Sequence, residues 1–189
     1  VDALEGLFSE LLDITRIDSG GIEAHPQHFP LADLYRKLRL HFEPAAFEKG
    51  LALRFRGGRH VVHADPLLVE RILRNLVSNA IRYTSDGTVL VGCRRRGDHL
   101  RLQVWDTGPG IAEDQQSRVF EEFYQVPHGP RAEPHQRKGL GLGLAIVKRL
   151  ADLMGAPVSL RSQPGQGTVF TLELPLGKQA PQAQPLLSG

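Results

Sequence analysis

Two asparagines and an arginine recur at helical spacing in the middle of the chain. Asn75, Asn79 and Arg82 follow the pattern i, i+4, i+7, so a helix would carry their side chains in one narrow polar stripe beside its apolar face. Asparagine competes with the backbone for hydrogen bonds, so two of them inside one helix require an explanation. Their amide oxygens could ligate a hard cation such as Mg²⁺, which is often shared with phosphates. Taken alone, the stripe is more simply explained as a solvent-facing helix surface.

A carboxylate and two glycines follow the end of an apolar run. The segment Asp106–Ile111 reads Asp-Thr-Gly-Pro-Gly-Ile, with its glycines at Gly108 and Gly110. Glycine lets the backbone approach a flat ligand closely, and a carboxylate at a strand end can accept a hydrogen bond from an exocyclic amine. Adenine carries such an amine where guanine carries an acceptor oxygen, so Asp106 would favour adenine. In isolation, an ordinary Gly-Pro-Gly turn capped by aspartate is a strong rival explanation.

Alternating glycines and leucines open a second predicted helix. Residues 138–144 read Lys-Gly-Leu-Gly-Leu-Gly-Leu. The free N–H groups and the dipole at a helix N-terminus form an anion site, which glycines allow a phosphate to approach; a flexible hinge is the alternative. The spacing is not the G-x-G-x-x-G of dinucleotide-binding folds, no strand precedes it, and the G-K-[S/T] of a P-loop is absent. A fourth motif, Gly165–Phe170, reads by itself as a hairpin turn entering a strand.

Apolar periodicity and turn residues predict the elements that must position these groups. Asp65-Pro66 is a helix start signal, an N-cap acid followed by proline at the first helical position. Residues 22–30 read as a connector, and residues 112–138 as a long connection with one short amphipathic piece at 119–124, a length typical of lids or linkers. The sequence predicts helices at 1–18, 31–49, 66–84 and 140–154, and strands at 51–55, 60–64, 88–95, 100–106, 158–162 and 168–174.

The order of these elements indicates an α/β fold, a two-layer sandwich in which a mixed, largely antiparallel sheet carries helices on one face. The 189 residues, 41% of them hydrophobic, suit one domain with a real core, and the single cysteine excludes a disulfide framework or a multi-thiolate metal site. A formal charge of +2 does not call for nucleic acid or an anionic membrane as a partner. No apolar run reaches the roughly 20 residues that a bilayer requires. Because the chain begins at Val1 and carries no signal peptide, we expect an excised, soluble, cytoplasmic fragment.

Taken together, in this order and spacing, the motifs resemble the ATP-binding catalytic domain of bacterial sensor histidine kinases, within the superfamily that includes gyrase, Hsp90 and MutL ATPases. The matching segments are the asparagine box at Asn75–Tyr83, the first glycine box at Asp106–Gly110, the phenylalanine box at Phe120–Phe123, the second glycine box at Gly139–Gly143 and the last at Gly167–Phe170. The resemblance covers roughly residues 30–175 and implies the Bergerat-type ATP-binding fold. Residues 1–20 resemble the end of the dimerisation helix that precedes this domain.

The resemblance implies a site for ATP and Mg²⁺. Asn79 would hold the metal, and Asn75 would lie beside it near the phosphates. Arg82 stands where many members have lysine, which keeps the charge but changes the hydrogen-bonding geometry, and Tyr83 would lie near the nucleotide. Around the triphosphate, the resemblance places the backbone of the glycine-leucine run and two basic residues before it: Arg137, Lys138, Gly139, Leu140, Gly141, Leu142, Gly143 and Leu144.

For the base, the resemblance implies that Asp106 accepts from the adenine amine, directly and through water, with help from Thr168. Gly108 and Gly110, followed by Ile111, would let the base enter.

The same resemblance indicates the type of reaction. The ATPase branch carries a glutamate one helical turn before the metal asparagine, where it activates water. Here that position is Asn75, which points to phosphotransfer rather than hydrolysis and assigns Asn75 and Arg82 to catalysis. The site would position ATP·Mg²⁺ under the lid at 112–138 while an imidazole attacks the γ-phosphorus in line.

The expected organisation is the end of a dimerisation helix at 1–20, a linker at 21–30, the catalytic domain at 31–175 and a disordered tail or linker at 176–189. Expected partners are the chain's own phosphoacceptor domain and a response-regulator receiver domain, fused downstream or separate. The parent protein would be a homodimer, with or without membrane attachment. None of the eight histidines has the family's His-Glu/Asp-x-x-x-Pro context, so we expect this fragment to bind ATP without autophosphorylating. Two rivals stay open: a degenerate module that scaffolds dimers or docks a receiver, and a kinase that phosphorylates serine on a partner, as anti-sigma factors do.

Overall fold

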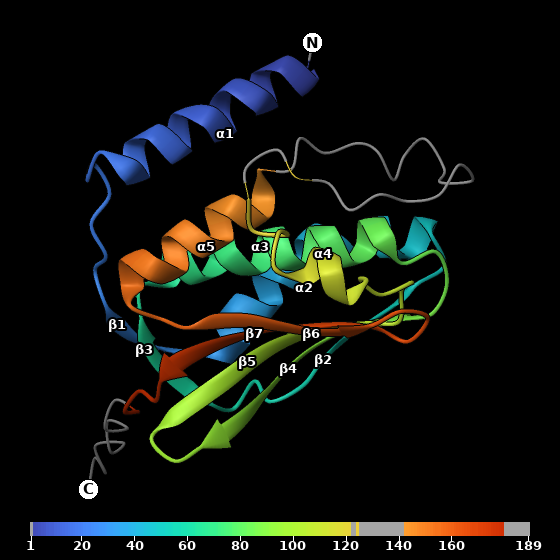
Figure 1. Cartoon of the computed structure of the whole chain (residues 1–189). Helices are drawn as coiled ribbons and strands as arrows, with labels where there is room; N and C mark the ends of the chain where they lie inside the picture. The colour runs from blue at the N-terminus through green and yellow to red at the C-terminus, as the bar shows by residue number, and fades with distance from the viewer. Residues whose placement is uncertain (1, 122–123, 125–141, 180–189) are drawn as a thin grey trace, which may run out of the picture.

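A five-stranded sheet and the helices on one of its faces make up most of the structure, a computed structural model that describes residues 2–121, 124 and 142–179 (Figure 1). The helices are α1 (Asp2–Asp18), α2 (Leu31–Glu48), α3 (Pro66–Tyr83), α4 (Glu113–Gln116) and α5 (Gly143–Met154). The strands are β1 (Gln27–Pro30), β2 (Ala52–Phe55), β3 (Val61–Ala64), β4 (Thr88–Arg96), β5 (His99–Asp106), β6 (Val158–Gln163) and β7 (Gly167–Pro175).

The large sheet has the order β2-β4-β5-β7-β6. Its edge strand β2 pairs with β4 in parallel, and the other pairs are antiparallel. Helices α2, α3 and α5 lie over one face of this sheet (Figure 1), where apolar side chains such as Leu73, Leu102 and Leu150 are fully buried. The predicted α/β sandwich with a mixed sheet is therefore confirmed.

A second, two-stranded sheet corrects the prediction for the connector at 22–30. Within it, Gln27–Pro30 forms β1, which pairs antiparallel with β3. Only Phe29 of this strand is buried, and its proline is unusual for a strand, so the local pattern carries no strand signal. The pairing partner comes from more than thirty residues further along the chain. Consequently β3 does not pair with β2, the strand before it in the sequence, and β2 belongs to the large sheet.

Helix α3 begins as its sequence signal predicts. The Asp65 carboxylate accepts hydrogen bonds from the backbone N–H groups of Leu67 at 2.9 Å and Leu68 at 3.3 Å, which satisfies donors that a helix start leaves open. Its second oxygen accepts from the N–H of His25 at 2.9 Å. One carboxylate thus caps the helix and ties its start to the segment that follows α1.

Three predicted boundaries differ from the structure. The four-residue helix α4 lies inside the predicted lid, whose residues 122–123 and 125–138 fall outside the described residues. Helix α5 is described from Gly143 rather than from residue 140, and residues 140–141 also fall outside the described residues.

The predicted tail begins too early, because Gly177 N–H donates to the Val61 carbonyl at 2.8 Å and Lys178 N–H to His28 Nδ1 at 3.1 Å. These bonds hold residues 176–178 against the small sheet.

Helix α1 lies along α5, on the side away from the sheet (Figure 1). Its Ile14 and Ile17 are buried and belong to the hydrophobic core. Among the described residues, no helix is long and apolar enough to cross a bilayer.

Candidate nucleotide-binding site

The polar stripe predicted on α3 is present in the structure. Asn75, Asn79 and Arg82 are all half-buried, between fully buried neighbours such as Leu76 and Ala80. Within the described part of the chain, neither asparagine amide has a hydrogen-bond partner, although both are partly withdrawn from water. Both amides keep access to solvent, so they can accept a partner that none of the described residues supplies.

Asp106 ends strand β5 with its carboxyl group held by backbone. Oδ1 accepts from the N–H of Gly108 at 2.9 Å, and the backbone N–H of Thr168 on the neighbouring strand also favours the charged carboxylate. Burial raises the pKa of Asp106 above the usual aspartate value, and the two N–H donors offset only part of this rise. Such a half-buried carboxylate is well suited to accept a hydrogen bond from a neutral donor on a ligand that shields it from water.

Close approach explains the glycines of the first glycine motif. A Cβ on Gly108 would lie 3.0 Å from both Asp106 Oδ1 and the Tyr83 carbonyl oxygen. Gly110 has φ +75°, and a Cβ there would collide with the carbonyl of Gln163. A side chain at either position would therefore displace the loop that follows Asp106.

The last glycine motif meets the first one across the β5–β7 pair. Thr168 lies opposite Asp106 in this antiparallel register. Gly167 has φ +111°, and a Cβ there would collide with the carbonyl of Asp106. Segments more than sixty residues apart thus form one backbone surface around the carboxylate.

Ser162, at the end of β6, is a site residue that the sequence did not indicate. Its hydroxyl accepts from the Ile111 N–H at 2.7 Å and shares a 2.8 Å hydrogen bond with Thr168 Oγ1. It also donates to the Gly167 carbonyl at 3.0 Å. A lone serine late in a strand carries no motif; only its position opposite Thr168 in the β6–β7 register would have revealed it.

The start of α5 reaches the stripe of α3. A Cβ on Gly143 would lie 3.4 Å from Asn75 Oδ1, so the last glycine of the glycine-leucine run lies directly beside the predicted phosphate-facing amide. Leu142 is fully buried, and Leu144 packs against the core. The other predicted phosphate contacts lie outside the described residues: Arg137, Lys138, Gly139, Leu140 and Gly141.

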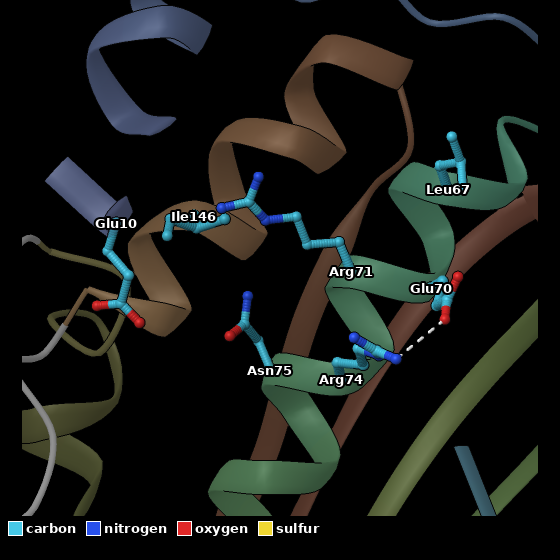
Figure 2. A pocket seen from close by; sticks show the side chains of 7 residues that line it. All are labelled: Glu10, Leu67, Glu70, Arg71, Arg74, Asn75 and Ile146. Atoms are coloured by element: carbon cyan, nitrogen blue, oxygen red, sulfur yellow. Dashed lines mark ion pairs between the residues drawn. The ribbon is translucent and has the colours of Figure 1, made fainter. Parts of the chain in front are cut away.

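A cavity of about 350 Å³ opens beside Asn75, between α1, α3 and α5. Figure 2 shows Asn75 and Arg71 of α3 and Glu10 of α1 around it, with Ile146 of α5 alongside. Its other lining residues are Leu67, Glu70 and Arg74. The cavity therefore adjoins Asn75, the predicted phosphate-facing residue, and Asp106 does not line it.

The donor set favours a hard cation held by amides over a soft metal. The described residues contain no cluster of three His, Cys, Asp or Glu side chains that could hold a metal ion. The open amides of Asn75 and Asn79 fit Mg²⁺ shared with phosphate oxygens, because that ion keeps several non-protein ligands. Carboxylate at one end and amides with a cation at the other suit a ligand with a purine base and a phosphate chain.

Comparison with known proteins agrees with this geometry. The family profile of "Histidine kinase-, DNA gyrase B-, and HSP90-like ATPase" matches residues 64–178. The chain is 33% identical over 180 residues to the sensor histidine kinase RcsC of Escherichia coli K12, covering 93% of this chain and 19% of that protein. It is 37% identical over 185 residues to the virulence sensor protein BvgS of Bordetella bronchiseptica, covering 94% of this chain and 15% of that protein. The chain thus spans less than a quarter of either relative.

Solved structures give the same result. Full-length ShkA in complex with AMPPNP superposes with a TM-score of 0.82 at 32% identity, over 95% of this chain and 37% of that one. The nucleotide-free catalytic domain of histidine kinase ThkA superposes with a TM-score of 0.68 at 26% identity, over 80% of this chain and 95% of that one. The chain therefore belongs to the histidine kinase-, DNA gyrase B- and HSP90-like ATPase family, as an ATP-binding catalytic domain of the sensor histidine kinase type.

Proposed function

We propose that this domain binds ATP·Mg²⁺ and transfers the γ-phosphoryl group to a histidine of a dimerisation domain, for relay to an aspartate of a response regulator. The observation that carries the proposal is that α3 meets both glycine motifs, because Gly108 lies against the Tyr83 carbonyl and Gly143 against Asn75. Helix α1 would be the last part of the dimerisation helix, residues 31–175 the catalytic domain, and the parent protein a homodimer working in the cytoplasm.

Each end of the site would recognise one part of the nucleotide. Asp106, with Thr168 and Ser162 behind it, would accept a hydrogen bond from the adenine amine. Gly108 and Gly110 allow the loop after Asp106 to pack closely on Tyr83 and Gln163, and this packed loop would lie against the base. Tyr83, whose carbonyl lies beside Gly108, would line the same side of the site.

The phosphate end would neutralise charge rather than supply a base. Asn79 would ligate Mg²⁺, and Asn75 would lie next to the phosphates with Gly143 at the start of α5. When bound, Mg²⁺ neutralises the charge on the phosphate oxygens. Arg82 adds a permanent positive charge on the same face of α3. Because Asn75 is neutral and cannot take a proton from water, this arrangement favours transfer to a nucleophile that needs no activation by a carboxylate.

The acceptor histidine would come from outside this chain, because none of its eight histidines has the family's phosphoacceptor context. The ThkA structure solved with the response regulator TrrA supports a response regulator as the partner that receives the phosphoryl group next. The test supplies the missing part. The domain is incubated with γ-labelled ATP, Mg²⁺ and a separately produced histidine-bearing dimerisation domain from the same parent protein. We expect acid-labile label on that histidine and none with Asp106→Asn. Acid-stable label on serine, or nucleotide binding without any transfer, would contradict the proposal.

A further inference from the structure

Helix α1 is held on the catalytic domain by two ion pairs and an apolar seam. Asp13 pairs with Arg71 of α3, and Asp18 Oδ1 lies 2.9 Å from Arg149 Nε of α5. Ile14 is buried between these two pairs at 6% exposure. The contacts follow one face of α1, so they fix the rotation of the helix about its own axis.

This rotation turns Glu10 toward the phosphate end of the candidate site. Figure 2 shows the Glu10 side chain at the cavity that Asn75 and Arg71 also line. Glu10 precedes Asp13 and Ile14 by one helical turn, so the docked face of α1 places it there. Within the described part of the chain, its carboxylate has no hydrogen bond and no ion pair.

The charges around Glu10 show which groups it faces. Burial raises the pKa of Glu10, while Arg82 and then Arg71 lower it and Asp13 raises it further. Arg82, which would neutralise the phosphates in the proposed function, is therefore the cation that acts most strongly on this carboxylate. Glu10 therefore interacts with the same positive charges, Arg82 and Arg71, that would attract a triphosphate.

We propose that docked α1 is an autoinhibitory contact, in which the Glu10 carboxylate opposes binding of the nucleotide's phosphates at Asn75 and Arg82. The inference rests on the proposed function. A triphosphate would bring several negative charges into a site where a carboxylate already shares the available cation, and like charges at close range in a partly dry site repel. Since coupling between two binding events is reciprocal, nucleotide would in turn weaken the docking of α1.

The mechanism gives α1 two separable parts. Asp13 and Asp18 act as positioning residues, since their ion pairs hold the helix in place while neither carboxylate lines the cavity. Glu10 supplies the opposing charge. Removing the charge should raise nucleotide affinity while α1 stays docked, which a purely structural role for Glu10 would not do.

The experiment compares the whole chain as wild type, Glu10→Gln and Glu5→Gln. Glu5 lies on α1 as well but is exposed, so its variant controls for the loss of one negative charge on the helix. Titration calorimetry with a non-hydrolysable ATP analogue and Mg²⁺ should give about fivefold or tighter binding for Glu10→Gln, the lower end of usual coupling strengths, and no change for Glu5→Gln. Equal or weaker binding by Glu10→Gln overturns the inference alone. Absence of binding in all three proteins overturns the proposed function and the inference with it.

Hydrogen exchange of the wild type provides the reciprocal measurement. The backbone amides of residues 10–18 should exchange faster with saturating analogue than without it, because nucleotide weakens docking. Unchanged or slower exchange of these amides, in a protein that binds the analogue, would overturn the inference. Thermal unfolding of the three proteins without nucleotide checks that the two substitutions leave the fold intact.

Discussion

The carboxylate of Asp106 accepts a 2.9 Å hydrogen bond from the backbone N–H of Gly108, two residues further along the chain. A Cβ on Gly108 would lie 3.0 Å from the same oxygen, so the loop folds back tightly over the carboxyl group. This hydrogen bond holds the carboxylate in a defined orientation at the strand end.

Asp106→Asn should lose most of the nucleotide affinity while keeping the fold. The variant replaces a charged acceptor by an amide, and hydrogen bonds to charged groups contribute about 1.5–3 kcal/mol, which corresponds to roughly 10- to 100-fold weaker binding. Calorimetric titration with an ATP analogue measures the loss. Asp98→Asn, on the exposed β4–β5 turn, is the matched control and should bind as the wild type does. Unchanged affinity in Asp106→Asn would refute the adenine role.

The same substitution should stabilise the nucleotide-free protein at neutral pH. Burial raises the pKa of Asp106 in the folded state, so the folded protein holds this proton more tightly than the unfolded chain does. Its contribution to stability is therefore present below the ordinary aspartate pKa and is lost as pH rises through the raised value. Asparagine removes this dependence. Tm measured across pH should be higher for Asp106→Asn at neutral pH, and the difference should shrink toward acid; a difference independent of pH would contradict the assignment.

Gly110→Ala should destabilise the protein far more than Gly165→Ala. Both glycines have left-handed backbone, with φ +75° and +81°, so alanine costs each about 1–2 kcal/mol of strain. A Cβ at 110 also collides with the Gln163 carbonyl, whereas none of the described residues lies within 4 Å of a Cβ at 165. Overpacking of this kind adds about 1–3 kcal/mol. Urea unfolding measures the free energy of unfolding of the two variants. Equal losses would contradict the close contact between position 110 and the Gln163 carbonyl.

Asn79→Ala should abolish the Mg²⁺-dependent part of nucleotide affinity. The amide has no partner among the described residues, so its removal costs little in stability and acts on the ligand. With EDTA present, wild type and variant should bind the analogue with the same affinity. With Mg²⁺, only the wild type should gain, by tenfold or more, about 1.4 kcal/mol. A variant that still responds to Mg²⁺ like the wild type would exclude Asn79 as a ligand.

Reversing both charges of the Asp13–Arg71 ion pair should restore the docking of α1, which each single charge reversal should weaken. The two side chains are 20% and 33% exposed, so solvent screens the pair and its contribution is about 0.5–1 kcal/mol. Asp13→Arg and Arg71→Asp should each speed the exchange of α1 amides, because each places like charges opposite one another. The double variant should return toward the wild-type rate. Additive acceleration in the double variant would show that the two residues do not hold α1 through this pair.

The elements with complete local signals were predictable. Helix α3 follows from the Asp65-Pro66 start and from apolar residues at helical spacing, and both signals depend on residues close together in the chain. The turn between β4 and β5 at Gly97 has a local cause of the same kind. Strand β1 was missed, because Gln27–Pro30 becomes a strand only when β3 supplies its hydrogen-bonding partner.

The sequence by itself determined the family, the two-layer fold and the candidate site residues, because motifs and periodicity are local. Only the tertiary structure decided that Ser162 bonds to Thr168, that Gly143 meets Asn75, and that α1 places Glu10 at the cavity beside Asn75. Each of these is a contact between segments far apart in the chain. Such contacts depend on strand register and helix packing, which no short stretch of residues encodes.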